Sequence, residues 1–181
     1  MKVKSNIKSR ITQEFFNQDV LEVAPSLLGK VLARQYENGI IERFIITETE
    51  AYRGEEDVAC HAHKGRTKRT DIMYHAGGHV YVYLIYGMYW MLNVVTGEKG
   101  APQAVLIRGV ESIVGPGRLG RHLKLDKSFY GEDLCQSNRI WLETALNEND
   151  YSEIETTKRI GIEYATDEWR NKKWRFILKR S

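Results

Sequence analysis

The sequence predicts a mixed α/β fold of the α+β class. We expect a single compact domain, in which helices flank a mainly antiparallel, curved sheet and one β-hairpin protrudes. Several runs rich in β-branched and aromatic residues have the length of strands, and short turn sequences join them in pairs. No repeat, low-complexity segment or linker marks a boundary within the 181 residues. The prediction is therefore one domain over residues 1–181, with residues 1–11 as a flexible N-terminal segment.

The first half of the chain predicts a helix followed by a hairpin. The helix is expected from about Asp19 to Leu28, with Pro25 interrupting it or lying near its start. The runs VLARQY and IIERFIITETEAY then flank the tripeptide Glu37-Asn38-Gly39. An Asn-Gly step between β-rich runs is a strong hairpin signal.

The second half predicts further strands and one short helix. The run HVYVYLIYGMYWMLNVV indicates two strands that turn at Tyr86 and Gly87, because glycine turns tightly without a steric penalty. AVLIRGV predicts another strand, and GPGRLGRHLKL predicts a short basic helix that begins just after Pro116. RIGIEY and RFILKR predict strands near the C-terminus.

Positive charge is concentrated in three stretches, although the net charge is only +3. Residues 61–79 carry four cations against one acidic residue, and residues 108–127 carry five against two. The tail from residue 169 carries six cations and no acidic residue, whereas residues 132–168 carry ten acidic residues against three cations. This polarity predicts a face suited to a polyanion, unless the fold scatters these cations in space.

The cysteine content and the N-terminal residues bear on the compartment. Cys60 and Cys135 are too few for a disulfide framework, so we expect reduced thiols. The basic N-terminal residues include no apolar stretch of the length that a signal peptide or a membrane helix needs. We therefore expect an intracellular protein with no membrane partner, in the cytoplasm or nucleoid of a prokaryote or the nucleus of a eukaryote.

Two glutamates end one of the predicted strands. Glu48 and Glu50 alternate with threonine, so both side chains project from the same face, with Tyr52 next along it. A carboxylate at this position can hold and deprotonate a water molecule, provided that it stays ionised. Acidic residues at strand ends more often only solvate the sheet edge, so the pattern leaves catalytic and structural roles open.

One cysteine and four histidines have nearly the ligand spacing of a small zinc site: Cys60, His61, His63, His75 and His79. Against this, the cluster contains only one cysteine, and the intervening segment is basic and lacks the hydrophobic pattern of a zinc finger. We expect no bound metal. One histidine is expected to line a pocket as a hydrogen-bond donor or acceptor, and the others to lie on the surface.

Aromatic residues crowd the predicted hairpin at positions 81, 83, 86, 89 and 90. Tyr81 and Tyr83 share one face of the first strand, whereas Tyr86 falls in the turn, where its ring can stand out from the protein. An exposed ring beside cations can fill the space that a nucleotide leaves when it swings out of a duplex. An acid, basic stretches and stacking rings are what an enzyme acting on a flipped-out base needs, although tyrosines in a sheet more often pack the core.

Six blocks of the sequence resemble a known family over nearly the whole chain, from about Phe15 to the C-terminus. The blocks are ETEAYRG, ACHAHKGRT, VYVYLIYGMYWMLNV, VLIRGVE, GPGRLGRHL and RIGI...EWR...WRFIL. Together they resemble the alkyladenine DNA glycosylases, which are also called methylpurine or 3-methyladenine DNA glycosylases. ETEAY and YVYLIYGMY are highly specific, and the blocks occur in order with compatible spacing. The resemblance implies an enzyme of base-excision DNA repair.

The resemblance implies roles for individual residues. Glu50 corresponds to the general base that activates water for attack on the sugar C1′. Tyr52 and His61 correspond to walls of the pocket for the extruded purine, and Tyr83 to the ring on its other face. Tyr86 resembles the tyrosine that intercalates into the duplex.

Two further positions follow from the same resemblance, and one departs from it. Asn93 matches the residue that excludes normal guanine by crowding its exocyclic amine, and Arg108 matches a residue that contacts DNA close to the flipped nucleotide. Cys60 stands where a small residue such as alanine is expected, which would alter the mouth of the pocket.

The implied reaction is hydrolysis of the N-glycosidic bond of a damaged purine in double-stranded DNA. Lesions of the 3-methyladenine, 7-methylguanine, hypoxanthine and ethenoadenine type are the expected substrates. The bond breaks through a sugar with oxocarbenium character, which an anionic carboxylate stabilises. The resemblance places no lysine for a Schiff base, so we expect a monofunctional, monomeric enzyme that needs no cofactor and leaves an abasic site.

Two other classes of function stay open on the sequence. A nucleic-acid-binding module without catalysis would use the basic stretches and the rings, with Glu50 in a structural role. A zinc-dependent hydrolase or deaminase would use the cysteine and histidine residues.

Overall fold

One long strand, β2 (Ile41–Arg53), organises the sheet of the computed structural model, which describes residues 9–144 and 151–180. Its first half pairs with β1 (Val31–Gln35), and its second half lies between β5 (Gln103–Val110) and β9 (Arg175–Arg180). The main path of the sheet is β3-β4-β5-β2-β1-β7, with β6 beside β5 and β8 beside β9. Every strand pair among the described residues is antiparallel.

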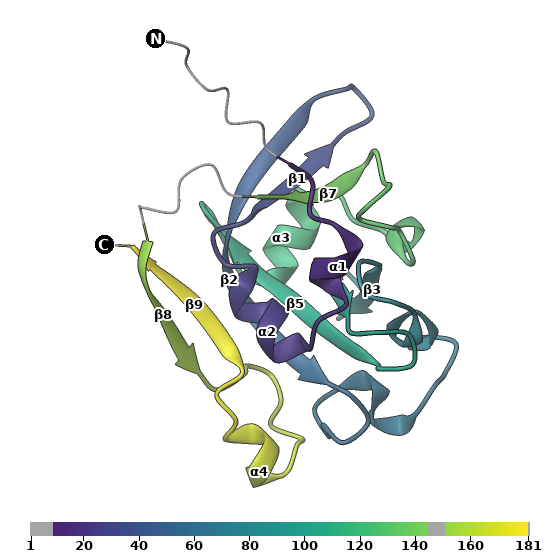
Figure 1. Ribbon diagram of the computed structural model, residues 1–181, viewed down its shortest axis with the longest axis vertical. Helices are drawn as coiled ribbons and strands as arrows, with labels where there is room; N and C mark the ends of the chain where they lie inside the picture. Colours follow the sequence, from purple (N-terminus) through teal and green to yellow (C-terminus); the bar gives the residue numbers. More distant parts are fainter. Residues whose placement is uncertain (1–8, 145–150, 181) are drawn as a thin grey trace.

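The remaining elements are, in chain order, α1 (Gln13–Phe16), α2 (Val20–Ser26), η1 (His61–Lys64), η2 (Asp71–Tyr74), β3 (Val80–Ile85), β4 (Tyr89–Thr96), β6 (Ile113–Val114), α3 (Pro116–His122), η3 (Lys127–Phe129), β7 (Ile140–Glu143), β8 (Tyr151–Thr157) and α4 (Asp167–Arg170). The three η elements are single 3₁₀ turns. Figure 1 shows α2 in front of β5 and the β8–β9 hairpin along one side of the sheet. The predicted fold class is confirmed: in the residues that the structure describes, a curled antiparallel sheet carries four α-helices in a single compact domain.

The pairing of β2 with β5 contains a β-bulge at Glu48, the first of the two glutamates. The pairing of β2 with β5 shifts register between Ile46 and Glu48 and again between Glu48 and Thr49. Bulges increase the local twist and re-aim side chains, and they are frequent beside active sites. The first half of β2 pairs with β1, whereas the second half, which carries Glu48 and Glu50, pairs with β5 and β9.

Both predicted hairpins are confirmed. β1 and β2 are joined through the Asn-Gly turn, in which the Gly39 N–H donates to the Tyr36 carbonyl. β3 and β4 turn at Tyr86 and Gly87, which both have positive φ, and the Met88 N–H closes the turn on the Ile85 carbonyl. Two consecutive positive φ angles are typical of a type I′ turn, whose twist matches that of the flanking strands.

Helices α2 and α3 cover the sheet and close the main core. Asp19 caps α2, since its side chain accepts from the Leu21 N–H, and the Thr49 hydroxyl of β2 donates to the Ala24 carbonyl. The predicted basic helix is present as α3, which begins at Pro116 itself rather than just after it, and it approaches β4 so closely that a Cβ at Gly120 would lie 1.8 Å from the Trp90 carbonyl oxygen. Glycine at this position therefore determines how near the basic helix lies to the β3–β4 hairpin.

Several local predictions were wrong. The run RIGIEY forms a loop rather than a strand, because its backbone turns toward a cavity and the Ile160 N–H is bonded to Glu50 instead of a neighbouring strand. Pro25 lies in the last turn of α2, where it neither interrupts the helix nor starts it. The strands β6, β7 and β8 and the short helices α1 and α4 were not predicted.

The N-terminal residues are packed against the domain from a point earlier than predicted. Of the predicted flexible segment 1–11, residues 1–8 lie outside the described residues, whereas Ile11 is buried and its N–H donates to the Leu142 carbonyl. The packed part of the chain therefore already includes Ile11. None of the helices in the described ranges has the length and apolar character needed to cross a membrane.

Candidate active site

A cavity of about 370 Å³ lies between the β3–β4 hairpin, the ends of β2 and β5, and the loop that follows β8. Its volume and its mixture of apolar, aromatic and a few polar side chains are typical of a small-molecule site. Segments far apart in the sequence contribute to it. Six of the seven predicted site residues line the cavity: Tyr52, His61, Tyr83, Tyr86, Asn93 and Arg108.

Glu50, the seventh, is fully buried and does not itself line the cavity. Its Oε2 accepts from the Tyr52 hydroxyl at 2.7 Å, and its Oε1 accepts from the Ile160 N–H at 2.7 Å. The Arg108 Nε lies 3.6 Å from Oε1. All three neighbours line the cavity, so only one layer of side chains surrounds the carboxylate on that side.

Burial raises the pKa of Glu50, because the charged carboxylate is removed from water. The charge of Arg108, the Ile160 N–H, the Tyr52 hydroxyl and the charge of Arg159 oppose this effect. Buried ionisable groups with opposing charged neighbours are frequent among catalytic acids and bases, so Glu50 is a candidate for such a role.

The two glutamates have different surroundings, although they share a face of β2 as predicted. The Glu48 Oε1 accepts from the Arg108 Nε at 2.9 Å and from the Arg175 Nε at 2.6 Å. Glu48 is therefore held in a double ion pair that joins β5 and β9 to β2. Glu50 is less closely paired, because the Arg108 Nε lies 3.6 Å from its Oε1. Glu50 is the carboxylate beside the cavity.

His61 faces the cavity with a neutral imidazole. Burial lowers its pKa to about 4, and the nearby Arg69 acts in the same direction. The His61 Nδ1 lies 2.8 Å from the Tyr81 hydroxyl, and its ring meets the Tyr83 ring edge to face at 4.5 Å. A neutral imidazole held in this way presents its other ring nitrogen as a hydrogen-bonding group.

Tyr83 and Asn93 are also held in place from behind. The guanidinium of Arg69 lies over the Tyr83 ring at 5.2 Å, and Tyr81 packs beside that ring at 5.5 Å. Asn93 is buried, and its Nδ2 donates to the Tyr81 carbonyl at 3.1 Å. The hydrogen bond to the backbone fixes the orientation of the amide at the cavity wall.

Tyr86 protrudes at the tip of the hairpin. Its side chain is 83% exposed, and its backbone adopts a φ of 51°, which is rare for a bulky residue. Met88 and Leu84 are also exposed on this hairpin. Arg121 of α3 covers the neighbouring Tyr89 ring at 5.0 Å, so a cation lies beside the exposed tip.

The sequence reasoning missed the loop after β8 as a wall of the site. Ile160, Ile162 and Tyr164 line the cavity, as does Tyr81 of β3. The Tyr164 ring is exposed, while its hydroxyl donates to the Ala59 carbonyl at 2.8 Å and thereby ties the loop to the residues that precede His61. The RIGI block within the family resemblance was the only signal for this loop.

The cysteine and histidine residues do not form a common site. The His63 Nδ1 lies against the Glu55 carbonyl, His75 pairs with Asp71, and the His79 Nδ1 lies against the Ala76 carbonyl. No group of three or more histidine, cysteine or acidic residues converges on a metal position within residues 9–144 and 151–180. Cys60 is a free thiol in the cavity wall, where burial raises its pKa to about 12.

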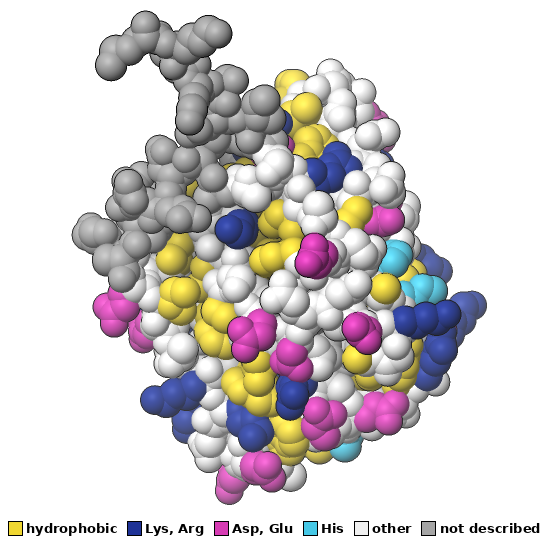
Figure 2. Space-filling view, in the orientation of Figure 1, with side chains coloured by type: hydrophobic (Ala, Val, Ile, Leu, Met, Phe, Trp, Pro, Cys, Tyr) yellow, Lys and Arg dark blue, Asp and Glu magenta, His cyan; other side chains and the backbone are white. Residues whose placement is uncertain are grey.

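Several cations lie in a groove next to the cavity. Tyr83 also borders a second groove, which is lined by Arg66, Lys68, Arg69 and Lys127. Figure 2 shows Lys and Arg side chains gathered at the right-hand edge of the molecule, beside histidine side chains. Part of the positive charge predicted from the sequence is therefore collected next to the cavity.

Comparison with known proteins identifies relatives over most of the chain. The family model described as methylpurine-DNA glycosylase matches residues 14–114 and 111–181. A protein of Borreliella burgdorferi strain ZS7 is 46% identical over 177 residues, covering 91% of this chain and 94% of its own length. Proteins of Natranaerobius thermophilus (40% identical, 94% of this chain and 96% of that protein) and Rickettsia conorii (45%, 93% and 89%) are also similar. All three are provisionally named 3-methyladenine DNA glycosylase.

Proposed function

Because this chain belongs to the methylpurine-DNA glycosylase family, a family of DNA repair enzymes, we propose that it excises damaged purines from double-stranded DNA, with Glu50 as the catalytic base. The substrates are purines of the 3-methyladenine, 7-methylguanine, hypoxanthine and ethenoadenine type. The product is free base and an abasic site. The relatives' name gives 3-methyladenine as the first lesion to test.

One observation carries this proposal: a buried carboxylate stands directly behind a cavity that is large enough for a purine and has several aromatic side chains in its walls. The cavity of about 370 Å³ holds Tyr52 and Tyr83 as stacking surfaces and His61 as a hydrogen-bonding group. Stacking of a base on such rings contributes about 1–3 kcal/mol per base, which offsets the cost of unpairing it. Damaged bases cost less to extrude and are therefore favoured.

Glu50 acts on the water that attacks the sugar. Each of its oxygens accepts one hydrogen bond from the protein and keeps a lone pair for a water. The water oxygen forms the new bond to C1′, its proton passes to Glu50, and the N-glycosidic electron pair leaves with the purine. A purine alkylated at N3 or N7 is already cationic and departs as a neutral base, whereas hypoxanthine also requires protonation.

The carboxylate acts in a second way while the bond breaks. The sugar develops positive charge, and an anion held in a dry wall of the site stabilises that charge more strongly than an anion in water would. The neutral His61 adds no opposing charge at this point, because its pKa is lowered to about 4. Tyr86 fills the space vacated in the duplex, from its exposed place at the hairpin tip.

The reaction stops at the abasic site. A lyase step requires an amine that forms a Schiff base with C1′. Among the described residues, none that lines the cavity is a lysine. We therefore propose a monofunctional enzyme that acts as a monomer, because one copy of the chain contains all of these residues.

A duplex cleavage assay tests this function. Duplexes that each contain one defined lesion are incubated with the protein, and strand cleavage is measured with and without alkali. We expect cleavage only after alkali, and at the lesion. Strand cleavage without alkali would contradict the monofunctional assignment, and no base release from any lesion would contradict the whole proposal.

Glu50→Gln distinguishes the proposal from the alternative of a binding module without catalysis. The variant keeps the size of the side chain and can bond to the Ile160 N–H, with the Tyr52 hydroxyl reoriented to accept from the amide. We expect it to bind lesion DNA like the wild type while base release is lost. Glu48→Gln is the matched control on the same face of β2. Base release by Glu50→Gln at the wild-type rate would leave only a structural role for Glu50.

A further inference from the structure

A buried ion pair lies directly behind the proposed active site. The Arg159 guanidinium contacts the Asp57 carboxylate through both of its terminal nitrogens, at 2.5 and 2.9 Å, and both side chains are completely buried. Arg159 immediately precedes Ile160, whose N–H is bonded to Glu50. The pair belongs to neither the cavity lining nor the set of residues predicted from the sequence.

The pair joins three segments that each carry a residue of the proposed site. Arg159 Nη1 donates to the Ala51 carbonyl at 3.0 Å, between Glu50 and Tyr52 of β2. Asp57 accepts from the Arg53 and Ala59 N–H groups, which shapes the turn that leads to His61. The third segment is the loop that begins with Arg159 itself. Because of these bonds, the relative positions of Glu50, the turn before His61 and the loop with Ile160 all depend on one charged pair.

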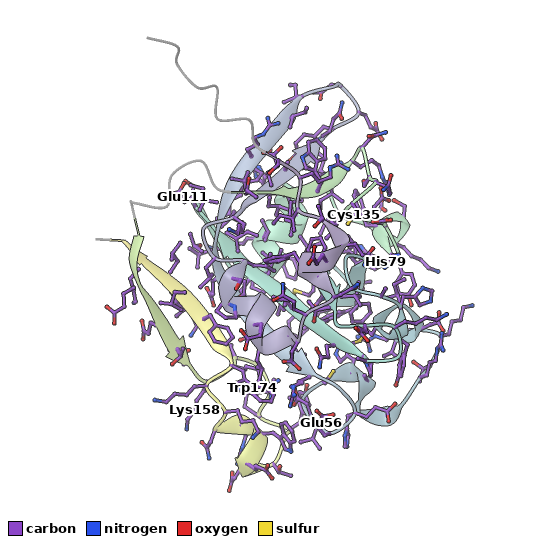
Figure 3. All side chains as sticks on the ribbon, viewed as in Figure 1. Glu56, His79, Glu111, Cys135, Lys158 and Trp174 are labelled. Atoms are coloured by element: carbon purple, nitrogen blue, oxygen red, sulfur yellow. The ribbon has the colours of Figure 1, made fainter. Side chains whose placement is uncertain are left out.

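Arg159 also supports the stacking surface from behind. Its guanidinium lies 4.9 Å from the Tyr52 ring and 5.1 Å from the Trp174 ring, so it is held between the two. The Lys172 Nζ also lies over the Trp174 ring, at 5.3 Å. Figure 3 shows Trp174 and Lys158 near the lower ends of β9 and β8. The ring proposed to stack on the base is thus supported by a cation that solvent does not reach.

Stability is a weak explanation for this arrangement. Ion pairs that are fully removed from water are often no more stabilising than apolar side chains of the same size. Within the part of the chain that the structure describes, the Arg159 Nε is in addition a buried donor with no hydrogen-bond partner. The burial of this ion pair is therefore better explained by the way in which it positions neighbouring groups than by a gain in stability.

We propose that Arg159, held by Asp57, is a positioning residue for the excision reaction. It sets the distance between the Glu50 carboxylate and the Tyr52 ring and holds the Ile160 N–H on Glu50. This inference rests on the proposed function. The Arg159 charge also lowers the pKa of Glu50, which keeps more of the carboxylate in its ionised form.

The experiment compares Arg159→Lys, Arg159→Met and Asp57→Asn with the wild type. Single-turnover base release from a 3-methyladenine or hypoxanthine duplex is measured between pH 5 and 9, together with the dissociation constant for the same duplex and a thermal melt. We expect each variant to release base on the order of 10- to 100-fold more slowly, because a small misplacement of reacting groups has effects of this size. Duplex binding should change less than threefold. In Arg159→Met the acid limb of the pH profile should also move to higher pH.

Arg34→Lys is the matched control. Arg34 is another buried arginine that donates to backbone carbonyls, including that of Leu123, but it does not line the cavity. Its substitution should lower the melting temperature without changing the rate or the pH profile of base release. Wild-type rates and an unshifted acid limb in the Arg159 and Asp57 variants would overturn the inference while leaving the proposed function intact. If the wild type itself releases no base from any lesion duplex, the proposed function fails first.

Discussion

Tyr86→Asn is expected to stabilise the free protein and to weaken its action on DNA. Tyr86 occupies the first central position of a type I′ turn with a φ of 51°, where its Cβ is strained. Its side chain is 83% exposed, so packing returns little of this cost. Asparagine tolerates the left-handed conformation, and Asn-Gly is the preferred sequence for this turn. A strained, exposed aromatic residue indicates a functional constraint on this position.

The magnitudes of the two effects can be worked out from this geometry. A left-handed backbone costs a bulky residue about 1–2 kcal/mol, of which asparagine recovers about 1 kcal/mol. For a chain of this size, that corresponds to a rise in melting temperature of about 2–4 °C. Loss of the stacking ring removes about 1–3 kcal/mol from the complex with flipped DNA. Binding of a lesion duplex should therefore weaken about 5- to 150-fold.

Two measurements on the same preparation check the prediction. Thermal melts give the stability of the free protein, and titration of a fluorescent lesion duplex gives the affinity. Tyr86→Phe is the control, since it keeps both the ring and the strained backbone and should match the wild type in both assays. A lower melting temperature for Tyr86→Asn would show that the ring stabilises the fold, and unchanged affinity would refute intercalation.

Three further predictions concern the cavity and its wall. Because the pKa of Glu50 is raised in the folded state, the protein should lose stability as pH rises from 4.5 toward that folded-state pKa, and melts of Glu50→Gln between pH 4 and 8 should lack this dependence. Base release should decline as pH falls through the same pKa, since the carboxylate then becomes protonated. His61 binds its proton more weakly in the folded state, so the stability that its neutral form provides is complete above pH 6.5 and is lost as pH falls to about 4; an NMR titration with an ordinary midpoint would contradict this. Asn93→Ala should increase excision of normal guanine relative to hypoxanthine by about tenfold, and an unchanged ratio in a competition assay would remove Asn93 from lesion selection.

Local patterns in the sequence were sufficient for most strands and for both hairpins. Both turns are short-range features: the type I′ turn at Tyr86-Gly87 depends on the two residues that adopt positive φ, and in the Asn-Gly turn Gly39 adopts positive φ while its N–H closes on the Tyr36 carbonyl. The alternation of Glu48, Glu50 and Tyr52 on one face also followed from the period of a strand. The fold class was correct for the same reason.

Local sequence patterns could not predict roles that depend on contacts between distant segments. Nothing in the alternation of β2 distinguishes Glu48 from Glu50, and the distinction on the sequence came from the family resemblance. In the structure, Arg175, more than one hundred positions away, pairs with Glu48, while Ile160 donates to Glu50. The loop that carries Ile160 reads as a strand because apolar residues alternate in it, yet these residues face a cavity.

The amino-acid sequence by itself was enough to establish the hairpins, the basic stretches and the motifs that point to a purine-excising enzyme, since each is a property of neighbouring residues. Tertiary structure decided which carboxylate stands behind the cavity, that the histidines do not converge, and that Arg159 and Asp57 pair beneath the site. The physical reason is that burial and partners determine the ionisation and orientation of a polar group, and both arise only when remote segments pack together.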